Sequence, residues 1–233
     1  MSINEQMPIL RTNKLSTGIQ ELDIILEGGY QNPGNLMILG PSGIEKSAMG
    51  YHFASALKED ENAYIICGTS SPQDIINKAS QIGIDLNAPS IYFIDCYSST
   101  LGKEQQSTEK ITIVPGPSAL NDISLALNEA FKASEGKRMR VVFDTWSTFV
   151  IYNAKDSIRK FLSVIEGRLK NANATALFLV DEGVHENQLL SLIEHGMDSK
   201  YVLNDKGGKI ELIVPGLDLE LPVRAGPTGL SIV

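Results

Sequence analysis

One stretch of the chain carries side chains that suit the binding of phosphate groups. The pattern G-x-x-x-x-G-K-[ST] surrounds phosphate oxygens with backbone N–H groups, places a lysine on the β- and γ-phosphates, and gives Mg²⁺ a hydroxyl ligand. The residues that match this pattern are Gly40, Gly43, Lys46 and Ser47. Glu45 stands where the second required glycine would be. The stretch is therefore nearly a phosphate-binding loop, altered at one position.

Glu45 can weaken phosphate binding in two ways. A residue with a Cβ is strained or excluded where the loop needs a positive φ or lies against a phosphate. A carboxylate about 4 Å from one phosphate charge is also repelled by roughly 4 kcal/mol at an effective dielectric near 20. Alternatively, the side chain turns to solvent or pairs with a cation. In a loop without ligand, Lys46 and Ser47 would be ordinary residues at a helix N-terminus, and the sequence leaves this open.

The elements that must position this loop alternate between apolar strands and amphipathic helices. Apolar residues recur at helical spacing in the helices, whereas the strands are short apolar runs. Ser71, followed by Pro72 and Asp74, is a strong helix start. The predicted helices are 19–26, 48–57, 72–83, 120–131, 158–169 and 188–195, and the predicted strands are 35–39, 63–67, 91–96, 111–114, 140–144 and 174–180.

The last part of the chain changes character. Short alternating strands at 200–203, 209–214, 220–223 and 230–233 are separated by glycine- and proline-containing turns. This pattern predicts an antiparallel extension. The fold class expected is therefore α/β, with a mostly parallel central sheet covered by helices and an antiparallel C-terminal part.

Composition and charge bound the class of protein. The 233 residues, 42% of them apolar, predict a single domain over 1–233 with an N-terminal tail at 1–11. The net charge of -8 disfavours non-specific binding to nucleic acid, which requires a basic face. The candidates for a local basic patch are 132–140 and 159–170, which on helices are more often solvated faces.

No feature of the sequence points to a membrane or to secretion. The first residues lack a signal-peptide layout, and no apolar run approaches the ~18 residues that span a bilayer. Cys67 and Cys96 each end an apolar run, which is typical of buried, reduced thiols. We therefore expect a cytoplasmic protein.

Other side chains that could take part in chemistry have simpler interpretations. The three histidines, His52, His185 and His195, show no metal-ligand spacing with the cysteines. Trp146 is expected in the core or at a subunit contact rather than as a base-stacking platform, because no basic groove is evident around it.

Several motifs together resemble the RecA-like P-loop ATPases, and the KaiC-like branch in particular. The resemblance covers roughly residues 12–233, and the lead-in plus the loop is its specific part. The motifs are Ser16-Thr17-Gly18-Ile19 with Leu22-Asp23 and Gly28-Gly29, then Ser71-Pro72-Gln73-Asp74, then Arg140 to Asp144 as a Walker B strand, and the ending Gly229-Leu230-Ser231-Ile232.

The resemblance implies a site for ATP or ADP with Mg²⁺, built on an altered, degenerate Walker A loop. Lys46 would lie on the phosphates, while Ser47 and Asp144 would hold Mg²⁺ directly or through water. The residues implied in nucleotide binding are Gly40, Pro41, Ser42, Gly43, Ile44, Glu45, Lys46, Ser47, Ala48 and Asp144. Binding of no nucleotide at all remains the alternative.

No catalytic residue is assigned. The family usually has one or two glutamates before the Ser71-Pro72 position to orient the attacking water, whereas this chain has Thr69 and Ser70. Asp181 and Glu182 follow another strand and could replace the missing base, although such residues are more often loop caps.

Three functions follow as hypotheses. The first is a regulatory or signal-transduction protein with a degenerate nucleotide site and little or no ATP hydrolysis, acting through a protein partner. The second is a working ATPase or autokinase, and the third is a recombination accessory protein on DNA, which the net charge of -8 disfavours. Self-association into a homo-oligomer is expected from the resemblance alone.

Overall fold

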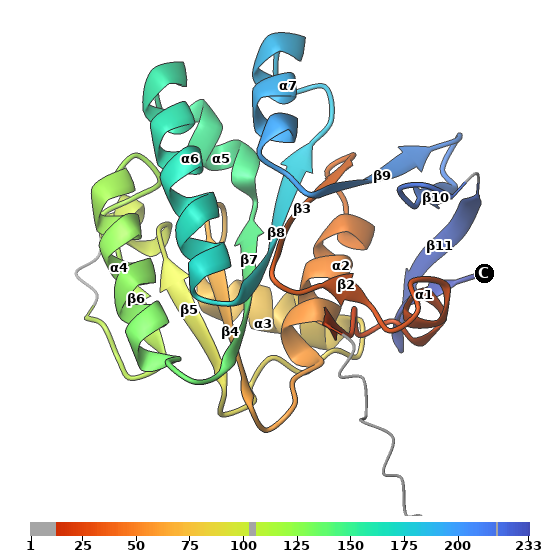
Figure 1. Cartoon of the computed structure of the whole chain (residues 1–233), viewed down its shortest axis with the longest axis horizontal. Coiled ribbons are helices and arrows are strands. Elements are labelled where there is room, and N and C mark those ends of the chain that lie inside the picture. Colours follow the sequence, from red (N-terminus) through yellow and green to blue (C-terminus); the bar gives the residue numbers. More distant parts are fainter. Residues whose placement is uncertain (1–12, 103–105, 218) are drawn as a thin grey trace, which may run out of the picture.

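A central ten-stranded sheet organises the chain (Figure 1). The computed structural model describes residues 13–102, 106–217 and 219–233, so the predicted tail at 1–11 lies outside the described residues. The strand order is β12-β11-β10-β9-β3-β8-β7-β4-β5-β6. These strands are β3 Gly34–Gly40, β4 Glu61–Cys67, β5 Ile91–Asp95, β6 Ile111–Ile113, β7 Arg138–Asp144, β8 Ala174–Asp181, β9 Ser199–Asp205, β10 Ile210–Ile213, β11 Glu220–Gly226 and β12 Gly229–Ile232. A separate two-stranded ribbon pairs β1 Lys14–Leu15 with β2 Tyr30–Gln31.

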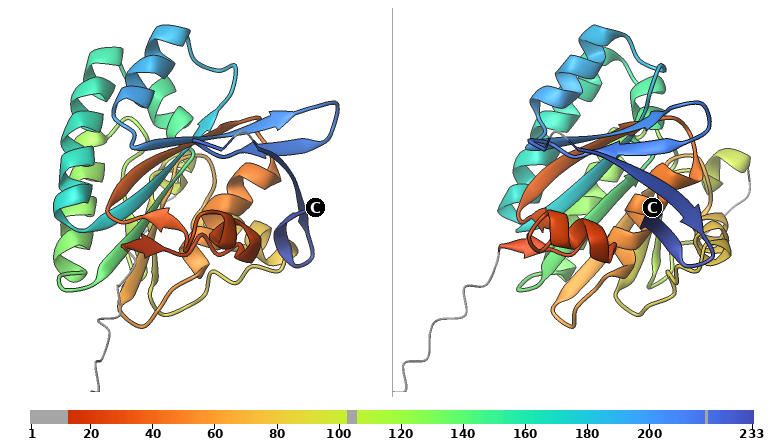
Figure 2. Two further views of the ribbon diagram at one scale, coloured as in Figure 1. Left: turned by 45° about the vertical axis from the view of Figure 1, so that its right-hand side comes forward. Right: turned by 90° about the vertical axis from the view of Figure 1, so that its right-hand side faces the viewer.

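Helices cover both faces of the sheet and create two apolar cores (Figure 2). One core contains side chains from α1 Gln20–Ile25, α2 Ile44–Ser55 and α3 Pro72–Gln81. The other contains side chains from α4 Leu120–Ala133, α5 Trp146–Ile151, α6 Lys155–Asn171 and α7 Asn187–His195. The predicted fold class, a helix-covered and mostly parallel sheet, is confirmed.

The direction of β9 corrects one part of the prediction. β9 pairs in parallel with β3 and antiparallel with β10, so only β10, β11 and β12 form the antiparallel extension. Alternation of apolar and polar residues reports which face is buried and carries no information about strand direction. The chain reaches β9 through a crossover that contains α7, and crossovers of this kind join parallel strands.

Two boundaries and one helix also differ from the sequence prediction. α2 begins at Ile44 rather than at residue 48 and ends at Ser55. The short helix α5 was missed, because six residues following a strand are too few for helical periodicity to appear. The capped start of α3 is confirmed, since Ser71 and Asp74 form a reciprocal capping box.

The core residues behave as their sequence context predicts. Trp146 is fully buried and stacks on Phe161, so it belongs to the core. Cys67 and Cys96 are buried free thiols. Arg140, part of a stretch considered as a basic patch, is fully buried in β7 and therefore cannot contribute to a basic surface. None of the described helices is long and apolar enough to cross a bilayer.

Candidate functional site

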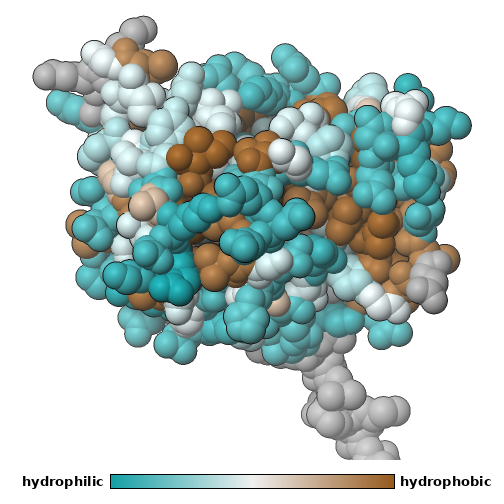
Figure 3. All heavy atoms as spheres, turned by 90° about the horizontal axis from the view of Figure 1, so that it is seen from above, coloured by the Kyte–Doolittle hydropathy of each residue, from teal (hydrophilic) through white to brown (hydrophobic). Residues whose placement is uncertain are grey.

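The predicted phosphate loop connects β3 to α2 at the carboxyl edge of the sheet. In the register of β3 with β8, Gly40 lies opposite Asp181, and β7 ends next to β8 at Asp144. Figure 3 views the molecule from this side and shows apolar surface interrupted by polar residues. Parallel sheets place ligand groups at this edge, so the predicted loop and the predicted Asp144 meet where a ligand site is expected.

A partly buried set of hydrogen bonds around Asp23 fixes the segment that leads into the loop. The carboxylate of Asp23 accepts hydrogen bonds from the Ser16 hydroxyl at 2.5 Å and from the Thr17 hydroxyl and backbone N–H, both at 2.6 Å. Arg140 donates to the carbonyl oxygens of Ser16 at 2.7 Å and Phe53 at 3.0 Å. The lead-in motif is thereby tied to β7 and to the helix α2 that follows the loop.

The two glycines of the loop differ in whether the structure requires a glycine at their position. A Cβ at Gly40 would lie 2.7 Å from the Cβ of Leu203 in β9, so the neighbouring strand itself demands glycine there. Gly43 has an extended backbone, with φ of -173°, which any residue can adopt. A Cβ at Gly43 would lie 3.4 Å from a carboxylate oxygen of Glu45, an ordinary contact.

The backbone strain expected at Glu45 is wrong. Glu45 lies in the first turn of α2, and the described non-glycine residues with positive φ are Glu27 and Asn173. Its carboxylate lies toward the loop glycine Gly43, and among the described residues it forms no ion pair. A carboxylate at a helix N-terminus is stabilised by the helix dipole, so Glu45 suits α2 while adding negative charge beside the loop.

Lys46 is buried and engaged by acceptors of the protein itself. It is only 2% exposed. Its ammonium donates to the carbonyl oxygens of Gly40 and Val180, each at 3.1 Å, and forms an ion pair with the carboxylate of Asp181. These three acceptors match the three donors of a lysine ammonium.

Asp181 accepts hydrogen bonds from several polar side chains in and beside the loop. Its carboxylate accepts hydrogen bonds from the hydroxyls of Ser42 at 2.7 Å and Thr145 at 3.1 Å, besides the contact with Lys46. Burial would raise the pKa of Asp181, but these hydrogen bonds and the charge of Lys46 outweigh it and hold the pKa below its ordinary value. Asp181 is therefore ionised at neutral pH and binds protons weakly.

Asp144 lies at the end of β7 in a poorly solvated position. It is 5% exposed, and burial raises its pKa to about 6, with the positive charges of Lys78 and Lys46 opposing the shift. Burial and the negative charge of Asp144 raise the pKa of the Tyr51 hydroxyl above its ordinary value, and the neighbouring Ser47 side chain opposes this shift. The two predicted Mg²⁺ ligands, Ser47 and Asp144, thus share one neighbouring side chain.

The region after β4, where a glutamate was expected, carries a cation instead. Lys78 of α3 donates a hydrogen bond to the Ser70 hydroxyl at 2.9 Å. Its charge is also among those that lower the pKa of Asp144. No carboxylate occupies positions 69 and 70, since these are Thr69 and Ser70.

Several residues near the site were not predicted from the sequence. Thr145 directly follows Asp144, and this position at the end of a strand was the available signal. Ser147 accepts from the backbone N–H of Asp181 and contacts His185 Nε2, both at 2.8 Å. The sequence carries no signal for this pairing because 34 or more residues separate the partners.

Glu182 differs from its neighbour in the sequence. Its backbone N–H donates to the Gly40 carbonyl at 2.9 Å, and its side chain is exposed.

The described residues contain no cluster of three His, Cys, Asp or Glu side chains that could hold a metal ion. A Mg²⁺ ion would therefore need ligands from a nucleotide as well as from the protein.

Comparisons with known proteins point to one family. The family model described as "ATPase: KaiC" matches residues 15–208. The circadian clock oscillator protein KaiC of Parasynechococcus marenigrum is 24% identical over 178 residues, which are 74% of this chain and 33% of that protein. The chain thus spans about a third of the length of this relative.

Two other relatives match over most of their own length. A UPF0273 protein of Aeropyrum pernix is 24% identical over 214 residues, covering 90% of this chain and 81% of that protein. The crystal structure of a KaiC-like protein from Pyrococcus horikoshii superposes with a TM-score of 0.71 at 17% identity and covers 95% of this chain and 99% of that chain. The structural likeness shows a shared fold.

Proposed function

The chain belongs to the KaiC family of ATPases, and from that premise we propose that it is a regulatory or interaction protein that hydrolyses ATP slowly or not at all. The observation that carries this proposal is the pairing of Lys46 with Asp181. The lysine that should meet the phosphates is buried and neutralised by the chain itself.

The charges around the loop oppose an incoming polyphosphate. To bind phosphate through Lys46, the protein must break the ion pair with Asp181 and leave that carboxylate beside the new anion. The carboxylate of Glu45 lies toward the same loop. Lys46 would gain the phosphate as its new partner, but Asp181 would keep only the hydroxyls of Ser42 and Thr145, and this loss of its cation opposes nucleotide binding.

The chemistry after binding would also be slow. Neither Thr69 nor Ser70 can accept a proton from water at neutral pH. The ammonium of Lys78 next to Ser70 can attract a phosphate oxygen but cannot act as a base while charged. Positions 69 and 70 therefore offer no base for turnover of any nucleotide that does bind.

The residues that would hold ATP or ADP follow from the family's loop pattern. Backbone N–H groups of 40–48, apart from Pro41, which has none, would face the phosphates, Lys46 would join them once released from Asp181, and Ser47 with Asp144 would hold Mg²⁺. When bound, Mg²⁺ neutralises phosphate charge. Occupancy of this kind would serve to fix the conformation of the loop for a partner protein.

The second candidate is a working ATPase or autokinase in which Asp181, Glu182 or a residue of an adjacent subunit supplies the base. The lowered pKa of Asp181 and its three donors speak against this role, because a general base works best with a pKa near the operating pH. Binding to DNA has less support still, given the net charge of -8. Self-association and a protein partner remain part of the proposal through the family resemblance.

The experiment is a thermal melt with and without Mg-ATP, combined with phosphate release in the purified chain. A ligand specific for the native state stabilises it by RT ln(1 + [L]/Kd), so millimolar Mg-ATP should raise the Tm little or not at all. Phosphate release should not exceed that of Lys46→Ala. Steady phosphate release that disappears in Lys46→Ala would instead show that the chain is a working ATPase.

A matched variant tests the reason for the effect. Asp181→Asn removes the charge that holds Lys46 but keeps the side-chain size, so it should increase the Tm shift caused by Mg-ATP. If Asp181→Asn leaves that shift unchanged, the ion pair is not what limits nucleotide binding.

A further inference from the structure

A large groove lies at the amino edge of the sheet, opposite the phosphate loop. It encloses about 1060 Å³ and is formed where β7 starts, where α6 gives way to β8, and where the chain enters β3 and β4. We call it the amino-edge groove. Its basic side chains are Lys14, Lys58, Lys132, Lys137 and Arg138, and its acidic ones are Asp60 and Glu135.

This surplus of positive charge contrasts with the rest of the chain. The lining carries five basic side chains against two acidic ones, whereas the whole chain has a net charge of -8. Part of the predicted basic stretch 132–140 therefore does form a local basic surface. It lies on the α4–β7 connection rather than along a solvated helix face.

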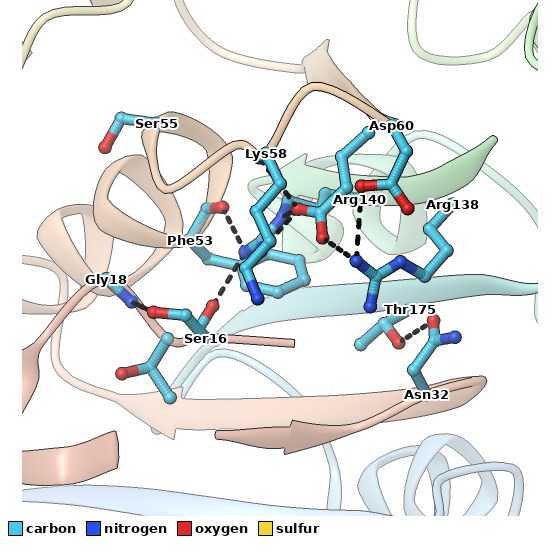
Figure 4. Close-up of polar contacts among 12 residues, drawn as sticks. Ser16, Gly18, Asn32, Phe53, Ser55, Lys58, Asp60, Arg138, Arg140 and Thr175 are labelled. Atoms are coloured by element: carbon cyan, nitrogen blue, oxygen red, sulfur yellow. Dashed lines mark hydrogen bonds and ion pairs between the residues drawn. The ribbon is translucent and has the colours of Figure 1, made fainter. Parts of the chain in front are cut away.

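Among the residues that the structure describes, two of these cations form no ion pair with a carboxylate. Lys137 contacts only the side-chain oxygen of Asn62, at 3.4 Å, and the Lys58 ammonium has no hydrogen bond or ion pair among the described residues. Figure 4 draws Lys58 in front of Arg140 and Phe53, with no contact marked at its ammonium. Both ammonium groups are therefore available to an external anion.

The remaining basic residues have partners that explain them. Lys132 lies in the last turn of α4, where a cation stabilises the helix, and it pairs with Glu129. Lys14 donates to the carbonyl of Leu26 at 2.5 Å. Stabilisation within a helix accounts for neither Lys58 nor Lys137, since both lie outside the helices.

A buried network holds the wall of the groove in place. Glu61 is fully buried and pairs with Arg140 and Arg138, each at 2.7 Å, while Asp60 lies 3.4 Å from Arg138. The turn before β7 is also fixed, because the Lys137 backbone N–H donates to Ser134 at 2.9 Å. A wall held in this way loses little conformational entropy when a ligand binds.

We propose that the amino-edge groove binds a small phosphorylated molecule carrying at least two neighbouring phosphate charges. Lys58 and Lys137 bind the phosphates, and the guanidinium of Arg138 offers donors left over from its carboxylate contacts. The volume suits a molecule of nucleotide size, because small-molecule sites hold roughly 300–1,000 Å³. This site is separate from the phosphate loop and does not depend on the function proposed for it.

The size of the basic surface favours a small ligand over nucleic acid. A nucleic acid is held by a continuous basic stripe that releases many counterions. Here a nucleic-acid strand that extends beyond the groove would approach a protein whose net charge is -8. A molecule that ends within the groove avoids this repulsion.

The test is calorimetric titration with inorganic tripolyphosphate in the absence of Mg²⁺. The double variant Lys58→Gln/Lys137→Gln should bind at least about tenfold more weakly than wild type, which corresponds to a loss of about 1.4 kcal/mol. The matched control Lys155→Gln removes one positive charge at the carboxyl edge, where Lys155 pairs with Glu186, and should bind like wild type. Lys46→Ala should also bind like wild type, which separates the groove from the phosphate loop.

Three results would overturn the proposal. Equal binding by wild type and the double variant would show that the groove does not hold the anion. Tighter binding of a single-stranded oligonucleotide through the same two lysines would make the groove a nucleic-acid site. Loss of self-association in the double variant, without any effect on tripolyphosphate, would assign the lysines to a second copy of the chain. Should Lys46→Ala fail to fold, the comparison with Lys155→Gln still decides.

Discussion

The two edges of the sheet use their lysines in opposite ways. At the carboxyl edge, Lys46 is 2% exposed and bound to Asp181 and two carbonyl oxygens, although its motif predicts a phosphate ligand. At the amino edge, Lys58 and Lys137 belong to no motif, yet the described residues leave their ammonium groups without a carboxylate.

The presence of a lysine in the sequence therefore does not establish that its positive charge is available to a ligand. A lysine binds an external anion only if the fold does not already supply one. The register that sets Gly40 opposite Asp181 supplies such an anion at the loop. Within the part of the chain that the structure describes, the Lys58 ammonium forms no such ion pair.

The sharpest test of the comparison is a double-mutant cycle on the buried pair. Lys46→Ala and Asp181→Asn should each lower the free energy of unfolding by about 3 kcal/mol without nucleotide, because each leaves a poorly solvated charge unpaired. Their combination should cost clearly less than the sum. Urea denaturation of the four proteins measures this. If Lys46→Ala is as stable as wild type, the ion pair with Asp181 contributes little and the Lys46 ammonium is free to bind phosphate. The two edges of the sheet would then not differ in this respect.

The next largest effect is expected at Asp144. Its pKa in the folded protein is about 6, above the ordinary 3.8, so the native state binds this proton more tightly than the unfolded state. The free energy of unfolding should therefore fall as pH rises from about 4 to about 6, by on the order of 2 kcal/mol.

The variant Asp144→Asn should remove that fall and be more stable than wild type at pH 7. Thermal melts between pH 4 and 8 check both statements. A wild-type profile with the same slope as Asp144→Asn would mean that Asp144 is better solvated than its 5% exposure indicates.

A smaller effect should separate charge from shape at Glu45. Because its backbone is helical and unstrained, Glu45→Gln should raise the Mg-ATP affinity about tenfold, nearly as much as the gain expected for Glu45→Gly. Calorimetry on both variants measures the gain, and Glu182→Gln controls for general loss of acidic charge at this edge. A gain with glycine alone would point to the Cβ rather than the carboxylate.

The smallest effect is expected at the amino edge. Lys58→Gln/Lys137→Gln should change the free energy of unfolding by no more than about 0.5 kcal/mol, because neither ammonium has an acidic partner in the fold. Denaturation without phosphate tests this. A loss comparable to that of Lys46→Ala would mean that the two lysines stabilise the native chain.

Most of the elements could be predicted because their signals are local. The capping residues of α3 and the apolar runs of β4, β7 and β8 lie within a few positions of one another. The short helix α5 and the parallel direction of β9 could not be predicted, since the first is too short for periodicity and the second depends on a crossover.

The candidate site divides in the same way. The loop 40–47 was predicted from residue types and their spacing, and Asp144 from the family resemblance. Thr145, Ser147 and His185 were not, because they meet the loop only through the pairing of strands far apart in the chain.

The sequence alone carries the order of most strands and helices along the chain, the glutamate within the loop, and Thr69 and Ser70 in place of a carboxylate. Only the tertiary structure decided which cations are neutralised. Asp181 reaches Lys46 across 135 positions because β3 and β8 lie side by side. The strength of a charge–charge interaction depends on distance and burial, and both are set by the packing of the whole sheet.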